Sequence, residues 1–207
     1  MGSSMRITGY PARLLAAKVR SVFAEKDYAF FDGDKALNLN LVGVRSPARE
    51  SNRFDDHLFT IYRNETLEWV VDYYEITTDP GNRFLTRPIN VDGAAILCPG
   101  QYRSTWKIGK HRGEYDALCQ LGGSVKVWRD DNKDTVLDLD VSTQTGWFGI
   151  NIHKRRSTAD TVDSSSAGCQ VFEHTSEYNE FMGTVKASRS VFGNSFTYTL
   201  LDEGDFQ

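Results

Sequence analysis

Two short apolar runs decide the expected fold: LFTIY at residues 58–62 and LEWVVDYY at residues 67–74, joined by a turn around Asn64 and Glu65. β-Branched and aromatic residues dominate both runs, and such side chains pack well on a pleated sheet. Both runs are short, and a polar turn separates them. They therefore predict a β-hairpin.

Further strand-like segments lie on both sides of this hairpin. Residues 37–44 begin by alternating apolar and polar side chains, which is the period of a strand with one buried face. Turn signals at residues 79–81 (DPG) and 99–100 (PG) divide the segments that follow. The other predicted strands cover residues 94–97, 102–108, 125–128, 136–141, 149–153 and 196–201. Many short strands divided by Gly and Pro turns predict a mainly β sandwich or barrel with a few helices.

Three segments are expected to be helical. Residues 11–26 place apolar side chains at steps of three and four along one stripe, and Pro11 suits a first helical turn. Residues 176–187 carry a second apolar face, made of Tyr178, Phe181, Met182 and Val185. Residues 114–121 predict a short helical turn. We expect the N-terminal amphipathic helix to pack against the sheet.

The composition is that of an ordinary globular chain. Its 207 residues are 40% hydrophobic and 25% charged, with a formal net charge of −4. This length suits one domain with a small N-terminal extension. The negative net charge offers no basic field to attract nucleic acid, and no apolar run is long enough to span a membrane. The first residues lack the basic-then-apolar pattern of a secretory signal.

Three cysteines, Cys98, Cys119 and Cys169, occur without any CxxC spacing, so we expect neither a metal site nor a cofactor. Spacing does not decide whether Cys98 and Cys119 pair. Cys169 differs from both, because the preceding residues 166–168 (SAG) form a tight turn rather than a core strand. Amide groups in such a turn can hold an oxyanion. Residue chemistry alone favours a nucleophile and a buried structural cysteine about equally.

His153, sixteen positions before Cys169, is the natural base for a cysteine nucleophile. It ends a strand whose alternation places Asn151 on the same face, and a Cys–His pair favours the thiolate–imidazolium form. A lone histidine at a strand end is more often a surface residue. The group that orients its ring is left open among Asp160, Asp163, Ser166 and a backbone carbonyl. Weaker candidates for a site role are His111, which lies among basic residues, and the rival base His174.

The pattern around these residues resembles the catalytic core of the L,D-transpeptidase (YkuD-like) family. The family's His, spacer and Ser/Thr-His-Gly-Cys motif match here at His153, Ser166, Gly168 and Cys169. Upstream, residues 58–74 resemble its first hairpin, residues 77–81 its Thr-Gly turn, and residues 99–102 with Ile108 its Pro-x-Gly segment. The resemblance covers about residues 54–173. The chain departs from the family at three positions: Ala167 replaces His, Lys154 replaces Gly, and Gln170-Val171 lacks the Arg or Asn.

This resemblance implies an L,D-transpeptidase-like β-sandwich or barrel, with residues 1–36 as an N-terminal helical extension and residues 37–207 as the catalytic domain. It implies that His153 deprotonates Cys169, which attacks a carbonyl of the peptidoglycan stem peptide. The catalytic group is then Cys169, His153 and Ser166. The backbone amides of Ala167, Gly168 and Cys169 hold the oxyanion, and the substrate contacts are His111, Lys154 and Gln170.

The thioester acyl-enzyme can be resolved in two ways. We expect hydrolysis of the stem peptide first, as in a phage lysin or an injected effector, and crosslinking by an L,D-transpeptidase next. A non-catalytic cell-wall-binding or virion structural module on the same fold is the alternative from another class. The expected partner is the stem peptide, with no nucleic acid, and the expected state is a monomer. Since no export signal is visible, the chain is expected to act at the cell wall or periplasm after release or injection, and otherwise to be cytoplasmic.

Overall fold

The computed structural model describes residues 11–156 and 160–206. The strands are β1 (Asn40–Arg45), β2 (Asp56–Arg63), β3 (Trp69–Thr77), β4 (Ala94–Leu97), β5 (Gly100–His111), β6 (Tyr115–Gln120), β7 (Val125–Asp130), β8 (Thr143–Gly146), β9 (Ile152–Lys154), β10 (Gln170–Phe172) and β11 (Phe196–Asp202). The helices are α1 (Ala12–Glu25), α2 (Asn82–Thr86) and α3 (Thr175–Phe192), followed by the 3-10 helix η1 (Glu203–Phe206). Across these ranges, no helix combines the length and apolar character that crossing a bilayer requires.

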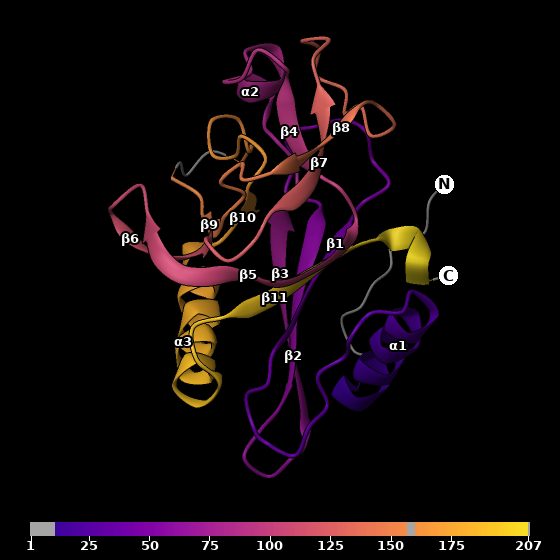
Figure 1. The fold of residues 1–207 in the computed structure, drawn as a ribbon, viewed down its shortest axis with the longest axis vertical. Coiled ribbons are helices and arrows are strands. Elements are labelled where there is room, and N and C mark those ends of the chain that lie inside the picture. Colours follow the sequence, from indigo (N-terminus) through magenta and orange to yellow (C-terminus); the bar gives the residue numbers. More distant parts are fainter. Residues whose placement is uncertain (1–10, 157–159, 207) are drawn as a thin grey trace.

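Eight of the described strands close into a barrel in the order β1-β11-β5-β6-β9-β10-β3-β2. The β1–β11 and β9–β10 pairs are parallel, and the other neighbours are antiparallel. Strands β4, β7 and β8 form a separate small sheet at one end of the barrel (Figure 1). The predicted mainly β class is therefore confirmed.

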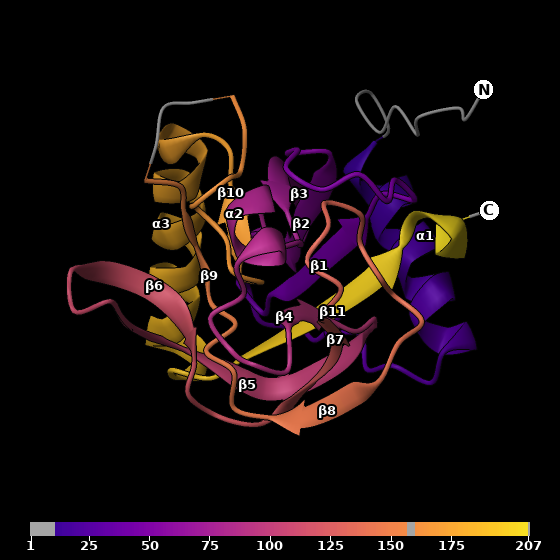
Figure 2. The ribbon, with the colours of Figure 1, turned by 90° about the horizontal axis from the view of Figure 1, so that it is seen from above.

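Helices α1 and α3 flank the barrel on opposite sides (Figures 1 and 2). Strand β2 explains this arrangement, because its successive side chains point to opposite faces. Leu58 packs in the cluster that contains Phe181 of α3, whereas Phe59 and Ile61 pack in the cluster that contains Phe23 of α1. Because both faces are covered, residues 58–61 of β2 are fully buried.

Several predicted elements are present and two are wrong. The hairpin of residues 58–74 is β2–β3, and the helix of residues 176–187 lies within α3. Residues 114–121 are not helical, because Tyr115–Gln120 pairs with β5 as strand β6. Residues 136–141 form no strand beyond an isolated bridge at Val136, since Leu137 is buried but no neighbouring strand runs alongside.

Candidate functional site

The cysteine lies where a tight turn meets strand β10. Gly168, just before it, has a φ of 119°, a conformation that favours glycine. A Cβ atom here would lie 2.0 Å from the carbonyl oxygen of Ala95 in β4. Ser166 closes the turn, because its hydroxyl donates to the carbonyl of Cys169 at 2.8 Å and accepts from the amide of Gly168 at 3.1 Å. The small residues before Cys169 thus permit close packing against β4.

The thiol of Cys169 is partly exposed at the surface, yet protein atoms crowd it. The amide of Asn151 donates to Sγ at 3.4 Å, and the thiol donates to the carbonyl of Gly149 at 3.5 Å. Burial raises the pKa of this thiol to about 11. Among the described residues, no hydrogen bond joins the thiol to His153. The resting thiol is therefore protonated, and the expected thiolate–imidazolium pair does not fit this environment.

His153 lies on the strand next to the cysteine, because β9 and β10 run parallel with His153 opposite Val171. Its Nδ1 lies 2.8 Å from the carbonyl oxygen of Lys154. Since a carbonyl only accepts, Nδ1 carries the proton and Nε2 keeps a lone pair. A backbone carbonyl thus orients the ring. Burial, and next the adjacent His111, lower the pKa of His153 to about 3, so this imidazole is neutral near pH 7.

A second imidazole stacks on the first. The ring centroids of His111 and His153 lie 4.0 Å apart, with an angle of 24° between the planes. Asn151 fixes this arrangement, because its Oδ1 accepts from the amide of Gln120 at 2.9 Å and its Nδ2 then donates to His111 Nδ1 at 3.2 Å. Burial, then the charge of Arg112, lowers the pKa of His111. Asn151 therefore connects this stacked pair of neutral imidazoles to the cysteine. Its side chain bonds to His111, and its backbone amide bonds to the thiol of Cys169.

Two predicted site residues have other roles than expected. Gln170 has no exposed surface, and its Oε1 accepts from the hydroxyl of Tyr198 at 2.8 Å inside the barrel. It is therefore a core residue and not a substrate contact. Ser166 is fully buried, and its hydroxyl bonds to the turn's own backbone. Ser166 therefore shapes the turn, and the carbonyl of Lys154 orients the ring of His153 instead.

The remaining candidates are spread more widely. The ammonium of Lys154 lies 4.8 Å from the ring centroid of Tyr115, and a role in substrate contact stays a prediction. His174 follows the far end of β10 and is 48% exposed, so it does not share the environment of Cys169. Cys98 and Cys119 are both buried free thiols, which answers the open question of their pairing.

A buried ionic network, which the sequence did not indicate, lies inside the barrel. Arg45 is 1% exposed, and its Nε lies 3.1 Å from Asp79 Oδ1. The hydroxyl oxygen of Thr78 lies 2.8 Å from Asp56 Oδ2 and 3.4 Å from Asp79 Oδ1. Thr78 has a single hydroxyl proton, so both contacts are hydrogen bonds only if one carboxyl is protonated. Burial, and next Asp79, raise the pKa of Asp56 to about 8.

The chain segment of this network is hydrogen-bonded to the turn before Cys169 and to strand β10. The amide of Gly81 donates to the carbonyl of Ser166 at 3.0 Å, and Gln170 Nε2 donates to the carbonyl of Thr78 at 3.4 Å. The segment that carries Thr78 and Asp79 therefore contacts both the turn and β10. Structural change in the network is expected to reach the cysteine through these bonds.

A pocket of about 260 Å³ opens beside the turn and has Ala167 in its wall. Trp147, which is 61% exposed, and Phe148 supply aromatic surface. The guanidinium of Arg129 lies 4.8 Å from the ring centroid of Phe148, and two hydrogen bonds hold it there. Aromatic surface beside a placed charge is a common feature of ligand pockets. Neither the pocket nor Arg129 had a sequence signal.

Replacing Gly168 by Ala is expected to disrupt the turn, because the added Cβ meets the backbone of Ala95. The strain should lower the free energy of unfolding by roughly 1–3 kcal/mol. Denaturant unfolding measures this effect. Gly183→Ala in α3 is the matched control, since its added Cβ meets no atom within 4 Å. Equal behaviour of both variants would contradict the prediction.

The raised pKa of Cys169 predicts its alkylation profile. Iodoacetamide should modify Cys169 about tenfold faster for each pH unit from about pH 7 to about pH 10, because the thiolate fraction rises in that proportion below the pKa. Peptide mass spectrometry separates this cysteine from Cys98 and Cys119. A small-molecule thiol provides the reference profile. A rate already constant near neutral pH would instead indicate a thiolate–imidazolium pair.

No metal ligands gather at the cysteine in the described ranges. There, the side chains near enough to share an ion are Glu75, Glu173 and His174, at the opposite end of β10.

Comparisons with protein-family models, curated proteins and solved structures find no match to this chain.

Proposed function

We propose that the chain is a cysteine acyl-transfer enzyme acting on the peptidoglycan stem peptide, as its resemblance to the L,D-transpeptidase family implies. One arrangement carries the proposal: a partly exposed Cys169 in a glycine-dependent turn, on the strand next to a neutral His153 whose Nε2 keeps its lone pair. A nucleophile beside a base that a third group orients is the arrangement that covalent catalysis needs.

Proton transfer and attack occur together in this mechanism. The pKa values of about 11 for Cys169 and about 3 for His153 lie about eight pH units apart. A preformed thiolate–imidazolium pair is therefore strongly disfavoured, before the attraction between its charges. His153 Nε2 therefore accepts the thiol proton as Sγ bonds to the substrate carbonyl carbon. The imidazolium then protonates the departing amine as the C–N bond breaks.

The oxyanion is held by amides of the turn. The amide of Gly168 already donates to Ser166, so Ala167 and Cys169 supply the donors in this mechanism. Such donors are worth several kcal/mol of transition-state stabilisation in a water-poor site. Water, activated by His153, then attacks the thioester and releases the Cys169 thiol. An amine in place of water gives a crosslink instead.

The pocket beside Ala167 receives part of the stem peptide. Arg129 supplies the positive charge there, and its second terminal nitrogen donates no hydrogen bond within the described residues. That nitrogen suits a substrate carboxylate. Arg129 thus takes the place of the Arg or Asn that the family carries after its cysteine and that this chain lacks. The chain acts as a monomer at the cell wall, after release or injection.

Incubation with purified sacculi, followed by mass spectrometry of the muropeptides, tests the function. Shortened stems are the expected result and indicate hydrolysis. New linkages between stems indicate transpeptidation. Unchanged muropeptides together with sacculus binding indicate the non-catalytic wall-binding or virion structural module. One observation favours that alternative: the thiol of Cys169 bonds to Asn151 and Gly149 rather than to His153.

A further inference from the structure

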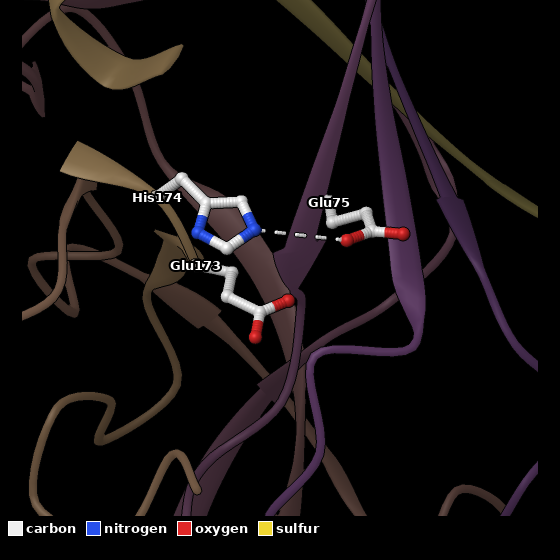
Figure 3. Close-up of side chains that lie close together, drawn as sticks. All are labelled: Glu75, Glu173 and His174. Carbon is white, nitrogen blue, oxygen red and sulfur yellow. Dashed lines mark ion pairs between the residues drawn. The ribbon is translucent and has the colours of Figure 1, made fainter. Parts of the chain in front are cut away.

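Three potential metal ligands meet at the end of β10 away from Cys169. Figure 3 shows Glu75, Glu173 and His174, with one ligand atom from each within 4.8 Å of the others. His174 Nε2 lies 3.9 Å from Glu75 Oε2. Glu75 comes from β3, and the other two follow β10 at the start of α3. Two carboxylates and one imidazole are a ligand set that suits Zn²⁺ and related ions.

The backbone beneath this group is held in place. The amide of Glu173 donates to the carbonyl of Glu75 at 3.0 Å, which continues the antiparallel pairing of Phe172 with Ile76. His174 is the residue before α3, and its side chain makes no capping hydrogen bond with the helix. Its imidazole is therefore available to a ligand. Two rigid strands and a helix start thus present all three side chains together.

A third carboxylate, that of Glu177, lies close enough to interact electrostatically with all three side chains. Glu177, in the first turn of α3, has its Oε2 buried without a hydrogen-bond partner among the described residues. Three carboxylates around one imidazole leave an excess of negative charge. A divalent cation would neutralise that excess.

We propose that Glu75, Glu173 and His174 bind one divalent transition-metal ion of the Zn²⁺ class. The ion ties β3 and β10 to the first turn of α3, so its role is structural and independent of the chemistry of Cys169. The ligands come from distant parts of the sequence. No local spacing such as CxxC therefore marks this site in the sequence.

Zinc binding to the Cys169→Ser protein tests the proposal, because that background removes the competing thiol beside His153. Calorimetric titration with Zn²⁺ and native mass spectrometry should give one ion per chain. Adding His174→Ala or Glu75→Gln should weaken Zn²⁺ binding at least tenfold, since each removes one ligand. Glu180→Gln is the matched control. It removes the same charge from an exposed position in α3 and should leave the affinity unchanged.

Thermal unfolding provides the second measurement. Excess Zn²⁺ should raise the midpoint of the Cys169→Ser protein and of its Glu180→Gln form, because the ion binds only the folded chain. The midpoint of the His174→Ala form should not rise. In a chelator, the variants should unfold like their parent, since Glu75 and His174 are each 48% exposed. Absent stoichiometric binding, or binding that survives both ligand substitutions, would overturn the proposal.

Discussion

Replacing Cys169 by Ala is expected to slow product formation from sacculi by at least about 10³-fold, because it removes the atom that forms the acyl-enzyme. The fold should tolerate this change, since the thiol makes only two long hydrogen bonds, at 3.4 and 3.5 Å. Muropeptide analysis measures the rate, and denaturant unfolding measures the stability. Full activity in the Cys169→Ala protein would refute the enzyme hypothesis.

Two further variants sharpen this experiment. Cys119→Ala removes a different thiol, which is buried, and should keep the activity, so it controls for general effects of cysteine loss. His153→Ala should also lose activity, whereas slow alkylation of its Cys169 should persist. Loss of activity with retained thiol chemistry separates a missing base from a missing nucleophile. Unfolding curves of both proteins must match that of the unaltered chain for the comparison to hold.

Replacing Arg45 by Met is expected to lower the free energy of unfolding by about 3–5 kcal/mol, because the carboxylate of Asp79 then remains buried without its partner. Adding Asp79→Asn should restore most of the loss, since both charges are then absent. Lys110→Met breaks a surface pair with Asp116 and is the matched control. It should change stability by no more than about 1 kcal/mol. Denaturant unfolding of the unaltered chain, the two single variants and the double variant measures these differences. If Arg45→Met lowers the free energy of unfolding no more than Lys110→Met does, the prediction is contradicted.

The same network makes the free energy of unfolding depend on pH. The pKa of Asp56 is raised to about 8 in the folded chain, against about 3.9 when unfolded. The folded state therefore holds a proton that the unfolded state releases. The contribution of Asp56 to stability is fully present below about pH 4 and is lost as the pH rises towards about 8. Asp56→Asn should flatten this part of the profile.

Local elements of the fold were predictable because their apolar patterns are local. Helix α3 buries a face that recurs at the helical period. The β2–β3 hairpin is marked by two short runs of β-branched and aromatic residues on either side of a polar turn. Strand β6 was mistaken for a helical turn, since Ala117 and Leu118 suit either conformation and only pairing with β5 decides between them. Strand β10 has three residues, too few for any period to appear.

The candidate site was predictable by residue type and not by arrangement. Cys169 and His153 carry reactive groups, and the turn before Cys169 is visible in the sequence. Their placement on adjacent strands depends on the parallel β9–β10 pairing, which no local pattern shows. The stack of His111 on His153 depends on the position of Asn151. Likewise, the register of β10 turns Gln170 into the barrel.

The parallel pairing of β1 with β11 has a consequence for how the chain acquires its structure. Strand β11 lies between β1 and β5. The last described strand therefore closes the barrel by pairing with β1, which is synthesised much earlier. During synthesis, β1 and β5 therefore keep unpaired edges until β11 leaves the ribosome. Contacts of such long sequence separation form slowly, and open edges recruit other chains. Solubility in the cell thus depends on how promptly β11 arrives, and chaperones that shield strand edges should raise the yield of folded protein.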